Sequence, residues 1–271
     1  MRPSLRAAIA ASIDAPPEAL PWIDAAFADM PSLGSAPRRL ARWLADAGLT
    51  QRSTLLDLGC GKGAAAIEVA RLTGCHAVGV DGFPPFIERA RALAQHCGLA
   101  DRCRFLVGDV RPLPPSVRPP AWAKARYHAA MMVGVLPLDE AAATLRPLVR
   151  RDGVYLIDDC IDTRPDASPG AALDAPLSRE EARAFLEQTG DEVLREHIPT
   201  PSQVLATERV LMDRMARRIE VLCRQEPAAR TPLRELLRRQ RAAAGMLAGR
   251  YRPAMWLIRR VGWRRAGVWR S

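Results

Sequence analysis

The sequence of 271 residues has no apolar run that approaches the roughly 20 residues needed to cross a membrane. A short apolar stretch, 7–11, follows Arg2 and Arg6, but Asp14 comes too soon after it for a signal peptide. We therefore expect a soluble cytoplasmic protein with no membrane partner.

Regularly spaced cysteines are also missing. The six cysteines stand at irregular spacings without a Cys-x-x-Cys pair, and the four histidines are scattered. Zinc sites and disulfide frameworks are recognised by short, regular spacings of such residues. The sequence therefore predicts reduced thiols, with neither a metal site nor a disulfide framework.

Lysine is nearly absent, because only Lys62 and Lys124 stand among the 40 basic residues. The formal net charge is +10, a value that first points to nucleic acid. Residues 191–271 contain 18 arginines and 8 acidic residues, whereas residues 1–190 contain 22 basic and 22 acidic residues. The whole surplus therefore lies in the C-terminal region, where solvated helix faces are favoured over a nucleic-acid groove, which stays open as an alternative.

Short apolar runs alternate with helical stretches between residues 54 and 160, which is typical of βα units around a parallel sheet. The expected strands are 54–58, 76–80, 104–107, 127–133 and 153–157. Strands in this order, joined by helices, predict a doubly wound α/β fold.

The flanks of this centre are predicted to add helices and two further strands. We expect residues 1–50 to form an N-terminal helical cap on a main domain of residues 51–271. Ser178 and Glu181 have the spacing of a capping box, and a sixth strand is expected at 192–198. Two helices are expected within 202–248, the second with Thr231 as N-cap, before a last strand at 254–258. The result is a seven-stranded, mostly parallel sheet with a helical insertion before its last strand.

A glycine-rich stretch follows the first expected strand and reads Asp57-Leu58-Gly59-Cys60-Gly61-Lys62-Gly63. Glycines allow a tight turn and let a ligand approach the backbone. Dinucleotide-binding loops share such glycines, but with the spacing G-x-G-x-x-G. Asp57 would repel a pyrophosphate, whereas it attracts a ligand that carries positive charge.

Two further acidic residues follow the next two strands. Asp81 stands 20 residues after Gly61, where an acid can accept both hydroxyls of a ribose. Asp109 taken singly is a turn or cap residue. In its place after the third strand, it is instead predicted to accept from an adenine amino group while Val110 packs on the ring. The pattern predicts a nucleoside ligand with a cationic tail.

These residues resemble the class I S-adenosylmethionine-dependent methyltransferases. The first motif of that family is matched by 57–63, its second-strand acid by Asp81 and its third-strand acid by Asp109, and the resemblance covers about residues 53–160. It implies a Rossmann-like fold and S-adenosyl-L-methionine as cofactor. The cofactor-binding residues that it implies are Asp57, Gly59, Cys60, Gly61, Gly63, Asp81, Gly82, Phe83, Asp109, Val110 and Val133.

The sequence defines the residues around the methyl acceptor less clearly than those around the cofactor. The stretch 131–137 lacks the Asn-Pro-Pro-Tyr or Asp-Pro-Pro-Tyr of adenine amino methylation. Asp158 and Asp159 after the fifth strand are candidate catalytic residues, as a base or as a clamp on a cationic amine. An equally weighted alternative is that one caps the loop and the other is solvated. Four residues are candidates for the substrate pocket, although for the first three a purely structural role is favoured: Trp22, Phe27, Met30 and Gly134.

The segments 79–87 and 157–159 are similar to a bacterial subgroup of small-molecule methyltransferases of unassigned substrate. The resemblance thus implies methylation of a small metabolite at N, O, S or C by a monomer or homodimer. Two alternatives stay open. One is an RNA or protein methyltransferase that uses the basic C-terminal region, and the other is an enzyme that binds S-adenosylmethionine on this fold without transferring a methyl group.

Overall fold

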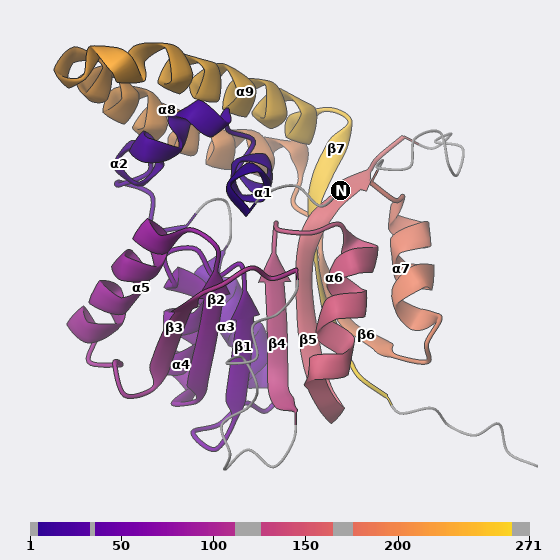
Figure 1. Ribbon diagram of the computed structural model, residues 1–271. Helices are drawn as coiled ribbons and strands as arrows, with labels where there is room; N and C mark the ends of the chain where they lie inside the picture. Colours follow the sequence, from indigo (N-terminus) through magenta and orange to yellow (C-terminus); the bar gives the residue numbers. More distant parts are fainter. Residues whose placement is uncertain (1–4, 33–35, 112–125, 165–175, 262–271) are drawn as a thin grey trace, which may run out of the picture.

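The computed structural model describes residues 5–32, 36–111, 126–164 and 176–261. Within these ranges, seven strands form one sheet in the order β3-β2-β1-β4-β5-β7-β6 (Figure 1). Neighbours among the first five strands pair in parallel, and β7 runs antiparallel to β5 and β6. The strands are β1 (Thr54–Leu58), β2 (His76–Asp81), β3 (Cys103–Val107), β4 (Tyr127–Val133), β5 (Val149–Asp162), β6 (Glu192–His197) and β7 (Tyr251–Arg259). The doubly wound, mostly parallel sheet is confirmed.

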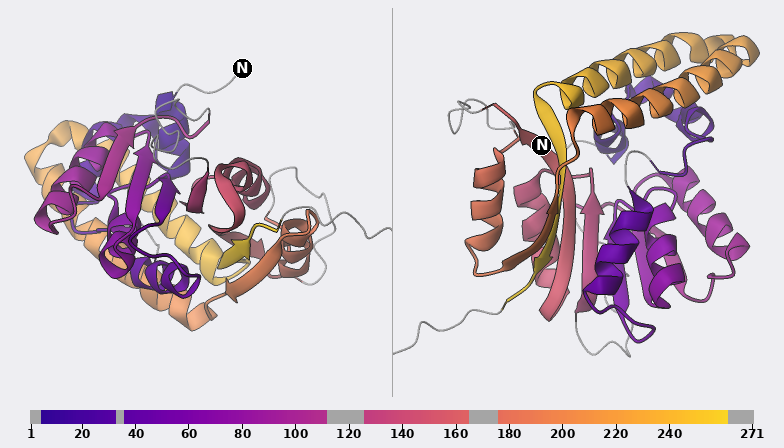
Figure 2. Two further views of the ribbon diagram at one scale, coloured as in Figure 1. Left: turned by 90° about the horizontal axis from the view of Figure 1, so that it is seen from below. Right: turned by 180° about the vertical axis from the view of Figure 1, so that it is seen from behind.

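Helices cover both faces of the sheet, and this explains why the central strands are mostly apolar. Every residue of β1 is buried. Leu55 belongs to the apolar cluster under one group of helices and Leu56 to the cluster under the other (Figure 2). The first group is α3 (Pro37–Asp46), α4 (Ala64–Thr73) and α5 (Pro84–His96), and the second is α6 (Leu138–Leu145), the 3-10 turn η3 (Arg146–Leu148) and α7 (Arg179–Glu187).

Two expected boundaries were wrong. Strand β5 extends to Asp162 instead of ending at residue 157. Its antiparallel hydrogen-bonded pairing with β7 runs from Val154 to Asp162 and therefore continues β5 beyond its apolar residues. The second helix of the insertion does not begin with Thr231 as its cap. The 3-10 turn η4 (Pro227–Ala229) runs directly into α9 (Arg230–Ala248), so Ala229 is the N-cap and Thr231 lies in the first turn.

The insertion between β6 and β7 consists of α8 (Pro201–Gln225) and α9, which lie beyond the carboxyl edge of the parallel strands (Figure 1). The N-terminal elements α1 (Leu5–Ser12), η1 (Pro17–Trp22) and α2 (Ile23–Ala26) lie beside them. The two groups share an apolar cluster separate from those of the sheet, with Ile23 and Phe27 packed among Met215, Ile219 and Leu233. We call these elements together the upper wall. No helix in the described ranges is both long enough and apolar enough to span a membrane.

The segment expected as one cap over residues 1–50 therefore divides into two parts. Residues up to Met30 join the upper wall. Helix α3 packs against α4 on the sheet instead, because its apolar side chains, Leu40 and Leu44, lie on one side of the helix and are fully buried there.

Helix α7 begins with the expected capping box. The Ser178 hydroxyl accepts from the Glu181 backbone N–H at 3.2 Å, and the Glu181 carboxylate accepts from the Ser178 N–H at 2.8 Å. Ser178→Ala is expected to lower the free energy of unfolding by about 1 kcal/mol in urea titrations. Ser178→Thr keeps the hydroxyl and is the control; equal losses in both variants would contradict the role of the cap.

Candidate functional site

A cavity of about 460 Å³ lies where β1, β2 and β4 end, at the carboxyl edge of the sheet under the upper wall. Open α/β sheets bind ligands at this edge, and the volume is typical of small-molecule sites. Acidic side chains outnumber basic ones among the residues that line it, which favours a cationic ligand. The acidic residues are Asp14, Asp57, Asp81, Asp109, Asp158, Asp159 and Glu208, and the basic residues are Lys62 and Arg111.

The glycine loop joins β1 to α4 and forms the inner floor of the cavity. Gly59, Gly61 and Gly63 all have left-handed backbone angles, with φ of +76°, +52° and +78°. A Cβ on Gly63 would lie 2.8 Å from the Phe105 ring, whereas one on Gly61 would meet nothing within 4 Å. Gly59, Cys60 and Gly61 line the cavity, but Gly63 does not. Gly63 therefore serves the packing of α4, and Gly61 leaves room for a ligand.

Asp57, on β1, is buried directly behind this loop. The Ala66 backbone, in the first turn of α4, hydrogen-bonds its carboxylate. Its Oδ2 atom is buried and has no hydrogen-bond partner in the described part of the chain. Burial, reinforced by the charge of Asp81, raises the pKa of Asp57 to about 8. A buried carboxylate oxygen without a partner is costly, and a cationic donor in the cavity would satisfy it.

Asp81, at the end of β2, is held in a fixed orientation. One of its carboxylate oxygens accepts from the Gly61 N–H and the other from the Phe83 N–H, both at 2.8 Å. Burial raises its pKa, and these two hydrogen bonds act in the opposite direction. Because each oxygen has a second lone pair, the group can still accept from two neighbouring hydroxyls on the cavity side. Gly82 and Phe83 line the cavity beside it.

Asp109 and Val110 lie at the rim, after β3. The Asp109 carboxylate accepts from the backbone N–H of Arg111 at 2.8 Å, which is the bond of a turn residue. Both residues also line the cavity, so the two roles considered for Asp109 are compatible.

Asp158 and Asp159, at the end of the straight part of β5, differ in their surroundings. The Asp159 carboxylate accepts from the Leu138 N–H at 2.8 Å, at the start of α6. The Asp158 carboxylate has no hydrogen-bond or ion-pair partner among the described residues, although its backbone oxygen accepts from the Gly134 N–H. Burial and the charge of Asp159 raise the pKa of Asp158 to about 7. Val133 and Gly134, at the end of β4, line the cavity beside Asp158.

Two of the three N-terminal residues expected near the substrate line the cavity, namely Phe27 and Met30. Trp22 does not. Its indole N–H donates to Glu226 at 2.5 Å, because the end of η1 faces the C-terminal end of α8 rather than the sheet. The expectation that Trp22 roofs the pocket is not met.

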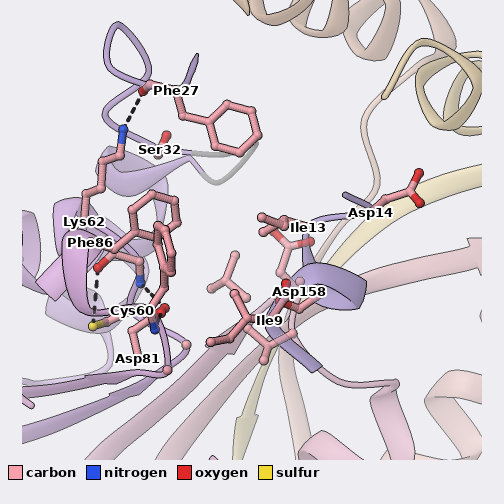
Figure 3. Close-up of a pocket in the computed structure, with 18 of the residues that line it drawn as sticks. Ile9, Ile13, Asp14, Phe27, Ser32, Cys60, Lys62, Asp81, Phe86 and Asp158 are labelled. Carbon is pink, nitrogen blue, oxygen red and sulfur yellow. Dashed lines mark hydrogen bonds between the residues drawn. The ribbon is translucent and has the colours of Figure 1, made fainter. Parts of the chain in front are cut away.

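Lys62 was not among the site residues predicted from the sequence. Its ammonium donates to the backbone oxygens of Phe27 and Met30 and lies 5.4 Å from the centre of the Phe86 ring (Figure 3). Burial lowers its pKa. The lysine thus ties the glycine loop to the upper wall. A role for Lys62 could have been inferred from its position inside the glycine motif, because it is one of two lysines in the chain.

The outer side of the cavity was also not foreseen. It is formed by α1, α8 and α9, with α1 seated so closely that Leu5 and Ile9 would contact a Cβ on Gly82. The wall residues include Ile13, which follows α1, and, from the helices themselves, Ile9, Glu208, Leu211, Met212, Gln240 and Ala243. Amphipathic patterns predicted the helices themselves, but a pattern carries no information on which far element a helix faces.

Comparisons with known proteins agree with this geometry. Residues 55–153 match the family model described as a methyltransferase domain. A sterol 24-C-methyltransferase of Eremothecium gossypii is 29% identical over 164 residues, which are 55% of this chain and 42% of that protein. A ribosomal protein L11 methyltransferase of Pasteurella multocida is 32% identical over 114 residues, 42% of this chain and 36% of that protein. The chain thus spans less than half the length of these relatives.

A solved structure shares the whole architecture. The S-adenosyl-L-homocysteine complex of an S-adenosylmethionine-dependent methyltransferase from Thiobacillus denitrificans aligns with a TM-score of 0.67 at 18% identity, over 87% of this chain and 96% of that one. The shared fold, the matched domain and the acidic glycine loop agree with one another. Residues 55–153 therefore match a methyltransferase domain, and the fold is the one seen in an S-adenosylmethionine-dependent methyltransferase of solved structure.

Proposed function

We propose that this protein transfers a methyl group from S-adenosylmethionine to a small molecule held beneath the upper wall. The observation that carries the proposal is the buried Oδ2 of Asp57 behind Gly59 and Gly61, which has no hydrogen-bond partner among the residues that the structure describes. It requires a donor from the cavity, and the ammonium group of S-adenosylmethionine is such a donor. Asp81 would accept from the ribose hydroxyls, and Val110 and Phe83 would flank the adenine, with Asp109 near its amino group.

When bound, S-adenosylmethionine supplies a methyl group on a positively charged sulfur. Transfer is an in-line displacement, so the protein acts mainly by holding the acceptor close to that methyl group and in line with it. The elements suited to this are the end of β4, with Val133 and Gly134, and the upper wall opposite it. The apolar lining of the wall also excludes water from the reacting groups.

A small acceptor is favoured because α1, α8 and α9 cover the cavity on the side away from the sheet. The name of the sterol 24-C-methyltransferase relative points the same way. The arginines of the C-terminal region give little support to a phosphate interface. Most of those described there bond to acidic side chains or backbone oxygens, as Arg218, Arg224, Arg238, Arg239, Arg250 and Arg259 do.

The proposal can be tested by fractionating acceptors. The purified protein is incubated with S-adenosylmethionine and either the ultrafiltrate or the retained macromolecules of a bacterial cell extract, and S-adenosylhomocysteine is quantified. We expect product with the filtrate and none with the macromolecules. Product that appears only with the macromolecular fraction would contradict a small acceptor, and absence of product from both fractions would contradict methyl transfer.

Asp81→Asn is expected to weaken S-adenosylhomocysteine binding by about tenfold to a hundredfold, because one charged acceptor for the ribose is removed. Isothermal titration calorimetry measures the affinity. Asp101→Asn removes an exposed carboxylate of the turn before β3 and is the matched control. An affinity of Asp81→Asn equal to that of the control would show that Asp81 does not bind the ribose.

A further inference from the structure

The side of the cavity opposite the glycine loop is a chamber that is continuous with the rest of the cavity but has a different lining. Figure 3 shows Asp158 next to Ile9 of α1 and Ile13 just after it, across the cavity from Lys62, Phe27 and Phe86. Helix α8 closes this chamber with Glu208 and Met212. We call it the outer chamber. It presents apolar side chains over most of its surface and carboxylates at one end.

Asp158 and Glu208 both line the cavity, as does Cys160 of β5. Burial raises the pKa of the Cys160 thiol to about 12, and the charges of Asp159, Asp158 and Glu208 act in the same direction. Neither the Asp158 nor the Glu208 carboxylate has a hydrogen bond or ion pair with another described residue. Asp159, by contrast, is already bound by the Leu138 N–H.

Among the described residues that line the cavity, the two basic groups are already engaged, and Arg39, whose charge also acts on Asp158, lies outside this lining. Lys62 is held by the backbone oxygens of Phe27 and Met30, and the Arg111 guanidinium lies 4.0 Å from the Asp109 carboxylate at the rim. An anionic ligand in the outer chamber would therefore meet two carboxylates and no available cation. A cationic ligand would satisfy both acids.

Resting on the proposed function, we propose that the methyl acceptor is a small apolar molecule with one basic amine, and that Asp158 and Glu208 bind this amine. In the reaction, the ammonium form of the acceptor gives one proton to the Asp158 carboxylate. The freed nitrogen lone pair then forms the new bond to the methyl carbon. The carbon–sulfur bond breaks, and its electron pair stays on sulfur, which becomes a neutral thioether. The product is the methylated ammonium ion.

The surroundings of Asp158 suit it both to bind the ammonium group and to accept a proton from it. Burial and Asp159 raise its pKa to about 7, against a smaller opposite effect from Arg39, so the group can take up a proton near neutral pH. Glu208, whose pKa burial also raises, would stay with the ammonium product.

The test uses three probes that share one skeleton: 4-phenylbutylamine, 4-phenylbutanol and 4-phenylbutyrate. Each is titrated by calorimetry into the full-length protein saturated with S-adenosylhomocysteine. We expect the amine to bind at least about tenfold more tightly than the alcohol, and the carboxylate to bind most weakly, because a charge-assisted hydrogen bond replaces a neutral one.

Asp158→Asn and Glu208→Gln are each expected to reduce the preference for the amine over the alcohol by about tenfold. Glu220→Gln, which removes an exposed carboxylate of the same helix α8, is the control and should keep the preference. An unchanged affinity for S-adenosylhomocysteine shows that a variant is folded. If one of the two variants does not fold, the other still tests the proposal.

Equal binding of the amine and the alcohol, tighter binding of the carboxylate, a preference that survives both substitutions, or failure of all three probes to bind would overturn the assignment of an amine acceptor. The preceding titration with S-adenosylhomocysteine separates this result from a failure of the proposed function. If S-adenosylhomocysteine binds and the probes do not follow the expected order, only the acceptor class is wrong.

Discussion

Asp57→Asn is expected to make the ligand-free protein more stable at pH 8 and to weaken the binding of S-adenosylmethionine by a hundredfold or more. Both effects come from the same buried carboxylate. Without a ligand, its Oδ2 atom has no partner within the described residues, and its ionisation is unfavourable. With the ligand, the charge is paired with an ammonium group. Loss of a buried charge-assisted bond costs about 3 kcal/mol or more, which corresponds to that fold-change.

The sign of the pH dependence follows from the raised pKa. The ordinary value for Asp is 3.8, and in the folded protein the pKa of Asp57 is about 8. Between these values the folded state holds a proton that the unfolded state has lost. The contribution of Asp57 to stability is therefore complete below about pH 4 and is lost as the pH rises toward 8, by an amount on the order of a few kcal/mol.

Urea unfolding at pH 5 and pH 8, without ligand, measures this difference. The wild-type protein should lose more stability between the two pH values than Asp57→Asn does. Asp101→Asn controls for the removal of an exposed carboxylate. Two results would contradict the role of Asp57 as the acceptor for a cationic group of the ligand. One is an Asp57→Asn variant that is less stable than wild type at pH 8, and the other is a variant that binds S-adenosylmethionine as tightly as wild type.

Gly63→Ala and Gly61→Ala are expected to damage different properties, although the two residues are only two positions apart. At Gly63, with φ of +78°, a Cβ would lie 2.8 Å from the Phe105 ring and 2.9 Å from the Ala90 Cβ. A left-handed alanine and an overpacked contact together cost about 2–4 kcal/mol of unfolding free energy. At Gly61 a Cβ meets no atom, so the stability cost is about 1 kcal/mol.

The binding of S-adenosylhomocysteine should follow the opposite order. The Cβ of Gly61→Ala would enter the cavity where the ligand approaches the backbone, and we expect its affinity to fall at least about tenfold. Gly63→Ala, in the fraction that stays folded, should bind more tightly than Gly61→Ala. Denaturant unfolding and calorimetry on both variants measure the two effects. Parallel losses in stability and affinity would show that the loop is a single structural unit.

The cofactor half of the site could be predicted from the sequence because its signals are local. A buried strand, a run of alternate glycines and the acids Asp57 and Asp81 at fixed distances from them determine one loop and its neighbour in the sheet. The order of the parallel strands then brings their carboxyl ends to one edge. Within this half, Gly63 is the one predicted binding residue that does not line the cavity. A glycine required for packing and a glycine required for ligand access cannot be told apart in the sequence.

The acceptor half could not be predicted to the same extent. Its walls come from α1, α8 and α9, whose amphipathic patterns reveal a buried side but not what buries it. Trp22, a candidate for the substrate pocket for which a structural role was favoured, reaches Glu226 instead of the cavity, and Glu208 was not distinguished from the other acids of a charged helix. The roles of Asp158 and Asp159 could not be separated from the sequence, because only the tertiary structure brings the start of α6 to Asp159, and a catalytic or binding role for Asp158 stays a prediction.

The apolar cluster of the upper wall joins segments that are far apart along the chain. The side chain of Gln240 donates to the backbone oxygen of Ile13 across a sequence separation of 227 residues, and Phe27 packs in the same cluster as Leu233. Contacts this remote require a long loop to close before they gain any energy, so they form late in folding. During synthesis, the packing of residues 5–30 against α8 and α9 cannot form until those two helices have left the ribosome. The wall of the cavity that α1, α8 and α9 form therefore depends on contacts between segments made at the beginning and near the end of synthesis.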